Sequence, residues 1–163
     1  MTDTTQTPIT QTMDFVHYEV KERVGYITLT RSEKRNALNA EMVTELKRAF
    51  AAAEDDDTCK VIVLRAEGKV FCAGADLEYL QRLQQYDYHD NLADSTHLME
   101  LFRQIYTLKK VVIAQVHGHA IAGGCGLASV CDFTFTVPDA RFGYTEVKIG
   151  FIPAIVKVFL LRK

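Results

Sequence analysis

Two short apolar runs, KVIVLRA at residues 60–66 and VVIAQV at residues 111–116, constrain the fold of this chain more than any other feature. Runs of this length and composition are typical of strands in a parallel sheet, and we expect the first to be buried on both faces. Residues 40–53 instead have helical periodicity, which places Met42, Val43, Leu46, Ala49 and Phe50 on one face. Strand and helix patterns that alternate along the chain predict an α/β fold with mainly parallel strands.

The remaining segments extend this alternation. Residues 15–20 and 24–30 predict an opening hairpin, and DFTFTV predicts a later strand. Residues 96–108 predict a second amphipathic helix, and a further helix is expected to begin near Pro153. The polar segment at residues 81–95 predicts a mobile helix end or a surface loop.

Composition narrows the classes of function. The formal net charge is −2 and no basic stripe is present, so nucleic acid is not expected as a partner. The start of the chain is polar and Thr-rich, without the pattern of an export signal, and the apolar runs are shorter than the ~20 residues that cross a bilayer. We therefore expect a soluble, cytoplasmic protein with no membrane partner, a disordered lead-in at residues 1–14 and one domain at residues 15–163.

The four cysteines form no CxxC pair, which predicts buried free thiols in a reducing compartment. His117 and His119 alternate at the end of a strand, but no third ligand has a suitable spacing, so no metal site is expected. Asp132, at the start of a strand, is expected to fix a backbone turn.

Two glycine-containing turns lie between a predicted strand and a predicted helix: FCAGADL at residues 71–77 and HGHAIAGGCGLASVCD at residues 117–132. Glycine lets a ligand approach the backbone, and the first turn of a helix has free N–H groups, so such a turn suits a phosphate or an oxyanion. The chain has neither GxxxxGK[ST] nor a well-placed GxGxxG, which disfavours a nucleotide phosphate. One turn alone is also consistent with close helix–strand packing. Two converging turns, however, can direct two N–H donors at one oxygen.

With these residues in view, the chain resembles the crotonase (enoyl-CoA hydratase/isomerase) superfamily from about Phe15 to its last residue. The resemblance rests on RNALN, FCAGADL, HGHAIAGGCGLASVCD, DARFG and TEVKIGFIP, in that order and spacing. It implies repeated ββα units with mainly parallel sheets. It also implies that a C-terminal helical region is missing, so that the chain is a fragment, and that the full-length protein forms a homotrimer or hexamer.

The resemblance further implies an acyl-CoA substrate whose thioester oxygen is bound by the backbone amides of Ala75 and Gly123, with Glu146 as acid and base. No separate cofactor is implied, because CoA is part of the substrate. The residues implied in substrate binding, with the positive charges of the first two expected near the CoA nucleotide, are Lys34, Arg35, Ala37, Ala73, Gly74, Asp76, Leu77, Gly124, Gly126 and Tyr144.

One position departs from the family pattern. Family hydratases have a second glutamate where this chain has Gly126. Three alternatives therefore stay open: a hydratase in which another residue, such as Glu78, Tyr144 or Thr145, completes the water site; a double-bond isomerase that uses Glu146 alone; and an acyl-CoA-binding protein without catalytic activity.

Overall fold

The computed structural model describes residues 10–150 and 152–161. Its strands are β1 (Thr10–Thr12), β2 (Val16–Lys21), β3 (Val24–Leu29), β4 (Val61–Ala66), β5 (Val111–Val116), β6 (Ala120–Ile121), β7 (Phe133–Thr136) and β8 (Phe142–Gly143). Its α-helices are α1 (Ala40–Asp55), α2 (Leu77–Leu83), α3 (Tyr88–Thr107), α4 (Gly123–Val130) and α5 (Ala154–Leu160). Two 3₁₀ helices are η1 (Ser32–Lys34) and η2 (Glu146–Ile149).

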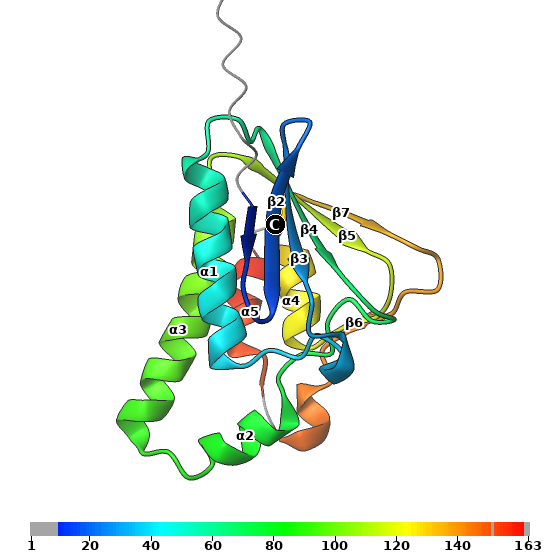
Figure 1. Cartoon of the computed structure of the whole chain (residues 1–163). Coiled ribbons are helices and arrows are strands. Elements are labelled where there is room, and N and C mark those ends of the chain that lie inside the picture. Colours follow the sequence, from blue (N-terminus) through cyan, green and yellow to red (C-terminus); the bar gives the residue numbers. More distant parts are fainter. Residues whose placement is uncertain (1–9, 151, 162–163) are drawn as a thin grey trace, which may run out of the picture.

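The main sheet has the strand order β1-β2-β3-β4-β5-β7 within the described residues (Figure 1). The predicted hairpin is confirmed: β2 and β3 are antiparallel, and Glu22 and Arg23 between them both have positive φ, as tight hairpin turns require. From β3 onward the neighbouring strands β4, β5 and β7 are parallel. The predicted α/β fold with mainly parallel strands is therefore confirmed.

The ββα repeat is visible in how the chain leaves each parallel strand. After β5 and β7 it forms the short parallel strands β6 and β8, and helices α4 and α5 follow. After β3 and β4 it forms isolated parallel bridges, Leu38 with Ala75 and Cys72 with Ala120, before α1 and α2. These short pairings bring the ends of the repeats together, and both glycine turns lie there.

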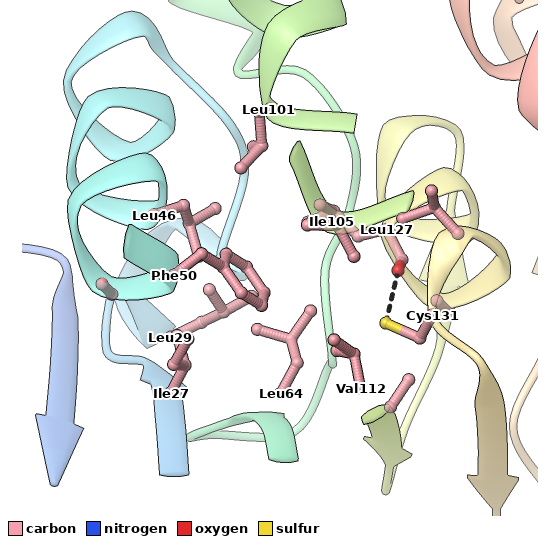
Figure 2. Packing of buried hydrophobic residues seen from close by; sticks show 14 of the residues in the cluster. Ile27, Leu29, Leu46, Phe50, Leu64, Leu101, Ile105, Val112, Leu127 and Cys131 are labelled. Atoms are coloured by element: carbon pink, nitrogen blue, oxygen red, sulfur yellow. Dashed lines mark hydrogen bonds between the residues drawn. The ribbon is translucent and has the colours of Figure 1, made fainter. Parts of the chain in front are cut away.

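The core lies between one face of the main sheet and the helices. Ile27, Leu64 and Ala114 are neighbours across β3, β4 and β5, and all three are fully buried. Helix α1 packs on β2 and β3, and α4 packs on β5 and β7. Figure 2 shows Phe50 of α1 beside the strand side chains, with Leu101 of α3 farther from the sheet. The amphipathic helix predicted at residues 40–53 is confirmed and extends to Asp55.

Three sequence-based expectations need correction. Thr10–Thr12 form β1, paired with β2, so the predicted disordered lead-in is corrected there; residues 1–9 lie outside the described part. Strand β4 is buried only at alternate positions, because within the described residues the helices cover one face of the sheet. Residues 81–95, predicted as a mobile helix end or a surface loop, contain the end of α2 and the start of α3, so the loop alternative is wrong at residues 88–95. Helix α3 begins at Tyr88, where the Asp87 side chain accepts a hydrogen bond from the Asp90 N–H.

The remaining predicted elements hold. Strand β7 and helix α5 lie where expected. Cys59, Cys72, Cys125 and Cys131 are all buried thiols outside any disulfide. Asp132 accepts a hydrogen bond from the Val112 N–H, which ties the end of α4 to β5. None of the described helices has the length and apolar character needed to cross a membrane.

Candidate active site

A cavity of about 450 Å³ lies where the ends of the ββα repeats meet. Its walls come from the starts of α1 and α5, from α2 and α3, and from the first residues of α4 and η2. The side chains around it are mostly apolar. Ala75, Gly123 and Glu146, the three residues that the sequence assigns to catalysis, all line this one cavity.

The first turn, between β4 and α2, holds the Ala75 N–H free. The Gly74 carbonyl accepts a hydrogen bond from the Leu38 N–H, and the Leu38 carbonyl accepts one from the Asp76 N–H. These two bonds fix the backbone on both sides of Ala75 without using its own N–H. Gly74 has φ +91°, a conformation that side-chain-bearing residues rarely adopt.

Asp76 is the N-cap residue of α2 and holds the end of this turn in place. Its carboxylate accepts hydrogen bonds from the Glu78 and Tyr79 N–H groups and forms a 2.7 Å ion pair with Arg31, and both charged side chains are about nine-tenths buried. Burial alone raises the pKa of Asp76, but the Arg31 hydrogen bond and the two backbone donors outweigh it and hold that pKa below its usual value.

The second turn, between β6 and α4, has an unusual backbone. Ala122 has φ +52° and ψ −122°, a region that residues with a Cβ seldom occupy, and it precedes Gly123, the first residue of α4. Gly124 packs directly against the turn that follows β4. A Cβ added at Gly124 would be 2.3 Å from the Cys72 carbonyl oxygen. Close packing thus fixes the direction of the Gly123 N–H.

The two turns touch each other. A Cβ added at Gly74 would lie 2.7 Å from the Ala122 Cβ and 3.4 Å from the Gly123 nitrogen. Among the described residues, neither the Ala75 N–H nor the Gly123 N–H has a hydrogen-bond acceptor. The Gly123 N–H also lies at the positive end of a helix. Two free donors beside one cavity are the arrangement that stabilises an oxyanion.

Glu146, the first residue of η2, faces the same cavity. Its Oε2 atom is buried and has no hydrogen-bond partner among the described residues. A buried carboxylate oxygen without a partner is costly, and such atoms are frequent where a substrate or proton is handled. Glu146 is thus available to exchange a proton with a molecule in the cavity.

Tyr144 is near Glu146 in sequence but does not line the cavity. Its hydroxyl lies 3.4 Å from the Ser129 hydroxyl of α4. Burial raises the pKa of Tyr144 to about 12, so this side chain stays protonated at neutral pH. Its position indicates that it supports the segment leading to Glu146.

Gly126, which replaces the second family glutamate, has no open space beside it. A Cβ added there would be 2.7 Å from Val156 and 2.9 Å from Phe102. The region that a longer side chain needs is thus occupied by α3 and α5, and Gly126 does not line the cavity. Of the two positions at which family hydratases have a glutamate, this chain has a carboxylate only at Glu146, which lines the same cavity as Ala75 and Gly123.

The other predicted substrate-binding residues surround the cavity without lining it. Lys34 is exposed and forms an ion pair with Glu78, and the Arg35 carbonyl accepts a hydrogen bond from the Ala73 N–H. The Ala37 carbonyl accepts a hydrogen bond from Arg31. Leu77 is 70% exposed.

Glu78, His117 and His119 do not line the cavity either. Glu78, a candidate for holding water, is exposed and paired with Lys34. Within the described residues no group of His, Cys, Asp and Glu side chains is arranged to hold a metal ion. His117 contacts the Gly68 carbonyl, and His119 accepts a hydrogen bond from the Arg141 N–H.

Sequence reasoning missed one polar pair in the cavity. Tyr79 of α2 donates a hydrogen bond from its hydroxyl to Asp94 of α3, and both side chains line the cavity. The available signal was the capping residue Asp87, since a helix that begins at Tyr88 includes Asp94. The pairing itself depends on how α2 and α3 cross.

Comparisons with known proteins agree with this geometry. The family model described as enoyl-CoA hydratase/isomerase matches residues 19–163. A protein of Thermus thermophilus whose name includes the words enoyl-CoA hydratase is 44% identical over 142 residues, which cover 87% of this chain and 56% of the relative. A crotonyl-CoA hydratase of Syntrophomonas wolfei is 35% identical over 83% of this chain and 51% of its own length.

A solved structure gives the same result at the level of the fold. The crystal structure of an enoyl-CoA hydratase from Shewanella pealeana superposes with a TM-score of 0.88 at 31% identity, covering 91% of this chain and 56% of that one. This α/β protein, with two free amides beside a carboxylate, belongs to the enoyl-CoA hydratase/isomerase family. The chain spans about half the length of the relatives it matches.

Proposed function

We propose that this protein is an enoyl-CoA hydratase, which adds water to a 2-enoyl-CoA. The observation that carries the proposal is the meeting of the Ala75 N–H, the Gly123 N–H and the Glu146 carboxylate at one largely apolar cavity. The names of the relatives, which are hydratases, support the same reaction. No separate cofactor enters the proposal.

In the proposed mechanism the thioester oxygen accepts hydrogen bonds from the Ala75 and Gly123 N–H groups. Attack of water at the β-carbon places negative charge on this oxygen, and the two preorganised donors stabilise the resulting enolate. Removing one such donor typically costs about 10²-fold or more in rate. Glu146 accepts a proton from the attacking water and returns a proton to the α-carbon.

The CoA portion is proposed to lie outside the cavity, along the exposed Lys34 and Arg35. Positive side chains suit its phosphates. Lys34 is held by Glu78 at 2.7 Å, so phosphate has to compete with this exposed ion pair. Asp76 and Gly124 are proposed to act by holding the two turns rather than by contacting substrate.

The experiment is a hydration assay on crotonyl-CoA with the Glu146→Gln variant. This variant keeps the shape of the side chain but loses its proton affinity, so we expect kcat to fall by about 10²-fold or more. Glu67→Gln is the matched control, because Glu67 is exposed and does not line the cavity. Unchanged kcat in Glu146→Gln contradicts the proposal.

Gly126 favours a second candidate, a double-bond isomerase. With α3 and α5 occupying the space beside Gly126, Glu146 is the carboxylate left near the amides, and one carboxylate is enough to move a proton between the α- and γ-carbons. Product analysis after incubation with a 2-enoyl-CoA and a 3-enoyl-CoA separates the two reactions. Thioester binding in calorimetry without any product favours the third alternative, a non-catalytic acyl-CoA-binding protein.

We also propose that the full-length protein assembles as a homotrimer or hexamer, as the family resemblance implies. The exposed apolar side chains of Val158, Leu160 and Leu161 at α5 are consistent with a covered surface. Light scattering at the exit of a sizing column measures the mass. A monomer at micromolar concentration contradicts this assembly.

A further inference from the structure

The cavity has a second, polar end that the proposed reaction does not use. Tyr79 follows Ala75 by four residues and lies in the first turn of α2, and its hydroxyl is hydrogen-bonded to Asp94 of α3. Val43 and Leu98, from α1 and α3, line the same cavity. The pair is thus a polar feature set among apolar side chains, displaced from the two amides along α2.

Asp94 is the acceptor in this pair and keeps capacity for another donor. Tyr79 is 9% exposed, and burial, together with its hydrogen bond to Asp94, raises its pKa well above the usual value, so the hydroxyl remains a donor. A carboxylate offers about four acceptor positions. Tyr79 uses one of them and fixes the direction of the side chain.

His97, another polar residue that lines the cavity, is already engaged. The two ring nitrogens of His97 lie 2.9 Å from the Thr44 hydroxyl and 3.3 Å from the Lys47 ammonium. Among the described residues that line the cavity there is no lysine or arginine. An acyl chain that ends in a carboxylate would be repelled by Asp94, because no lysine or arginine among the described residues lines the cavity to compensate the charge. An acyl chain with a neutral hydrogen-bond donor would instead find an acceptor in Asp94.

We propose that Asp94 selects enoyl-CoA substrates whose acyl chain carries a hydroxyl group, which donates a hydrogen bond to the carboxylate. Tyr79 is a positioning residue that holds Asp94 toward the cavity. This inference rests on the proposed function, since it assumes that the thioester lies at Ala75 and Gly123. It adds the class of acyl group that the same site prefers.

The test compares three substrates of equal chain length: 2-hexenoyl-CoA, its analogue with a terminal hydroxyl and its analogue with a terminal carboxylate. We expect kcat/KM to be at least about tenfold higher for the hydroxyl analogue than for the hydrocarbon, and lowest for the carboxylate. A protein that handles the hydrocarbon as well as the hydroxyl analogue overturns the inference.

Variants of Tyr79 and Asp94 test whether this pair causes the preference for the hydroxyl analogue. Asp94→Leu is expected to remove the difference in kcat/KM between the hydroxyl analogue and 2-hexenoyl-CoA, and Tyr79→Phe is expected to reduce this difference in part. Asp90→Leu is the matched control, one turn earlier on α3 at an exposed position outside the cavity. If Asp94→Leu lowers kcat equally on all three substrates, Asp94 acts at the reacting carbons and the inference fails.

Calorimetry separates this inference from the proposed function. Hexanoyl-CoA and its terminal hydroxyl analogue lack the reacting double bond, so their binding does not depend on turnover. Tighter binding of the hydroxyl ligand, lost in Asp94→Leu, supports the inference even if no thioester is hydrated. Hydration with no difference between the two ligands in binding or turnover leaves the proposed function standing and rejects the role of Asp94.

Discussion

The two turns that present the free amides are held in different ways. The turn at residues 71–77 depends on charge: the Asp76 carboxylate accepts hydrogen bonds from two backbone N–H groups and forms an ion pair with Arg31. The turn at residues 121–126 depends on packing: Gly124 touches the Cys72 carbonyl, and Ala122 adopts a backbone conformation that its Cβ disfavours. One donor is therefore placed by electrostatics and the other by steric fit.

The Ala75 and Gly123 N–H groups have the same proposed role, but the turns that hold them are expected to respond differently to substitution. A turn held by a buried ion pair loses stability when either charge is removed. A turn held by close packing is instead sensitive to added volume and insensitive to charge. Each of the following changes tests one of these two kinds of contact.

The largest effect is expected from Arg31→Met, which leaves the buried Asp76 carboxylate without its cation. Removing one partner of a buried pair typically lowers the free energy of unfolding by about 3 kcal/mol or more. Thermal and denaturant unfolding measure the loss. Lys34→Met is the control, since Lys34 belongs to an exposed pair, and no resolved change in stability is expected. If the two substitutions lower the stability equally, the turn at residues 71–77 is not held by the buried ion pair.

Gly124→Ala adds a methyl group against the Cys72 backbone and tests the packed turn. We expect a loss of about 1–3 kcal/mol in the free energy of unfolding, because the Cys72 carbonyl oxygen, 2.3 Å from the added Cβ, has to move. Gly143→Ala is the matched control, because a Cβ there meets nothing within 4 Å. If both variants are equally stable, Gly124 is not fixed by contact.

Ala122→Gly is expected to have a smaller effect of opposite sign. Glycine adopts φ +52° without strain, so relief of backbone strain outweighs the entropy that glycine loses on folding, for a net gain of about 1 kcal/mol or less. Gly74→Ala, at φ +91°, is expected to destabilise. Chemical denaturation measures both. A loss of stability in Ala122→Gly shows that this backbone is not strained.

The smallest effect is the pH dependence of the first turn. The pKa of Asp76 is lowered in the folded protein, so its contribution to stability is present above its usual value of 3.8 and is lost as the pH falls through the folded-state pKa. The stability difference between the wild type and Asp76→Asn should therefore shrink below about pH 4. A difference that stays constant down to pH 2 contradicts the ion-pair description.

Much of this arrangement follows from local sequence patterns. The apolar runs and helical periodicity predict the parallel strands and α1, because neighbouring residues decide them. FCAGADL and HGHAIAGGCGLASVCD predict both amide turns for the same reason. Strand β1 is different: its residues TQT carry no apolar signal, and the strand exists because β2 offers it a partner.

The site is predictable only in part, since side chains distant in sequence complete it. That Phe102 and Val156 fill the space at Gly126 depends on how α3 and α5 pack on α4. The bond between Tyr79 and Asp94 depends on two helices joined by a short turn. No periodicity encodes these contacts, so the family motifs identify the amides and Glu146 but not the other end of the cavity.

The most direct test of the central claim, that the Ala75 and Gly123 amides bind one thioester oxygen, is an NMR titration of the ¹⁵N-labelled protein. Two ligands are compared: butyryl-CoA and the S-butyl thioether of CoA, which lacks the carbonyl group. We predict that both amide proton resonances move downfield with the thioester and stay near their free positions with the thioether. Shifts that are the same for both ligands, or a response at only one amide, contradict the claim.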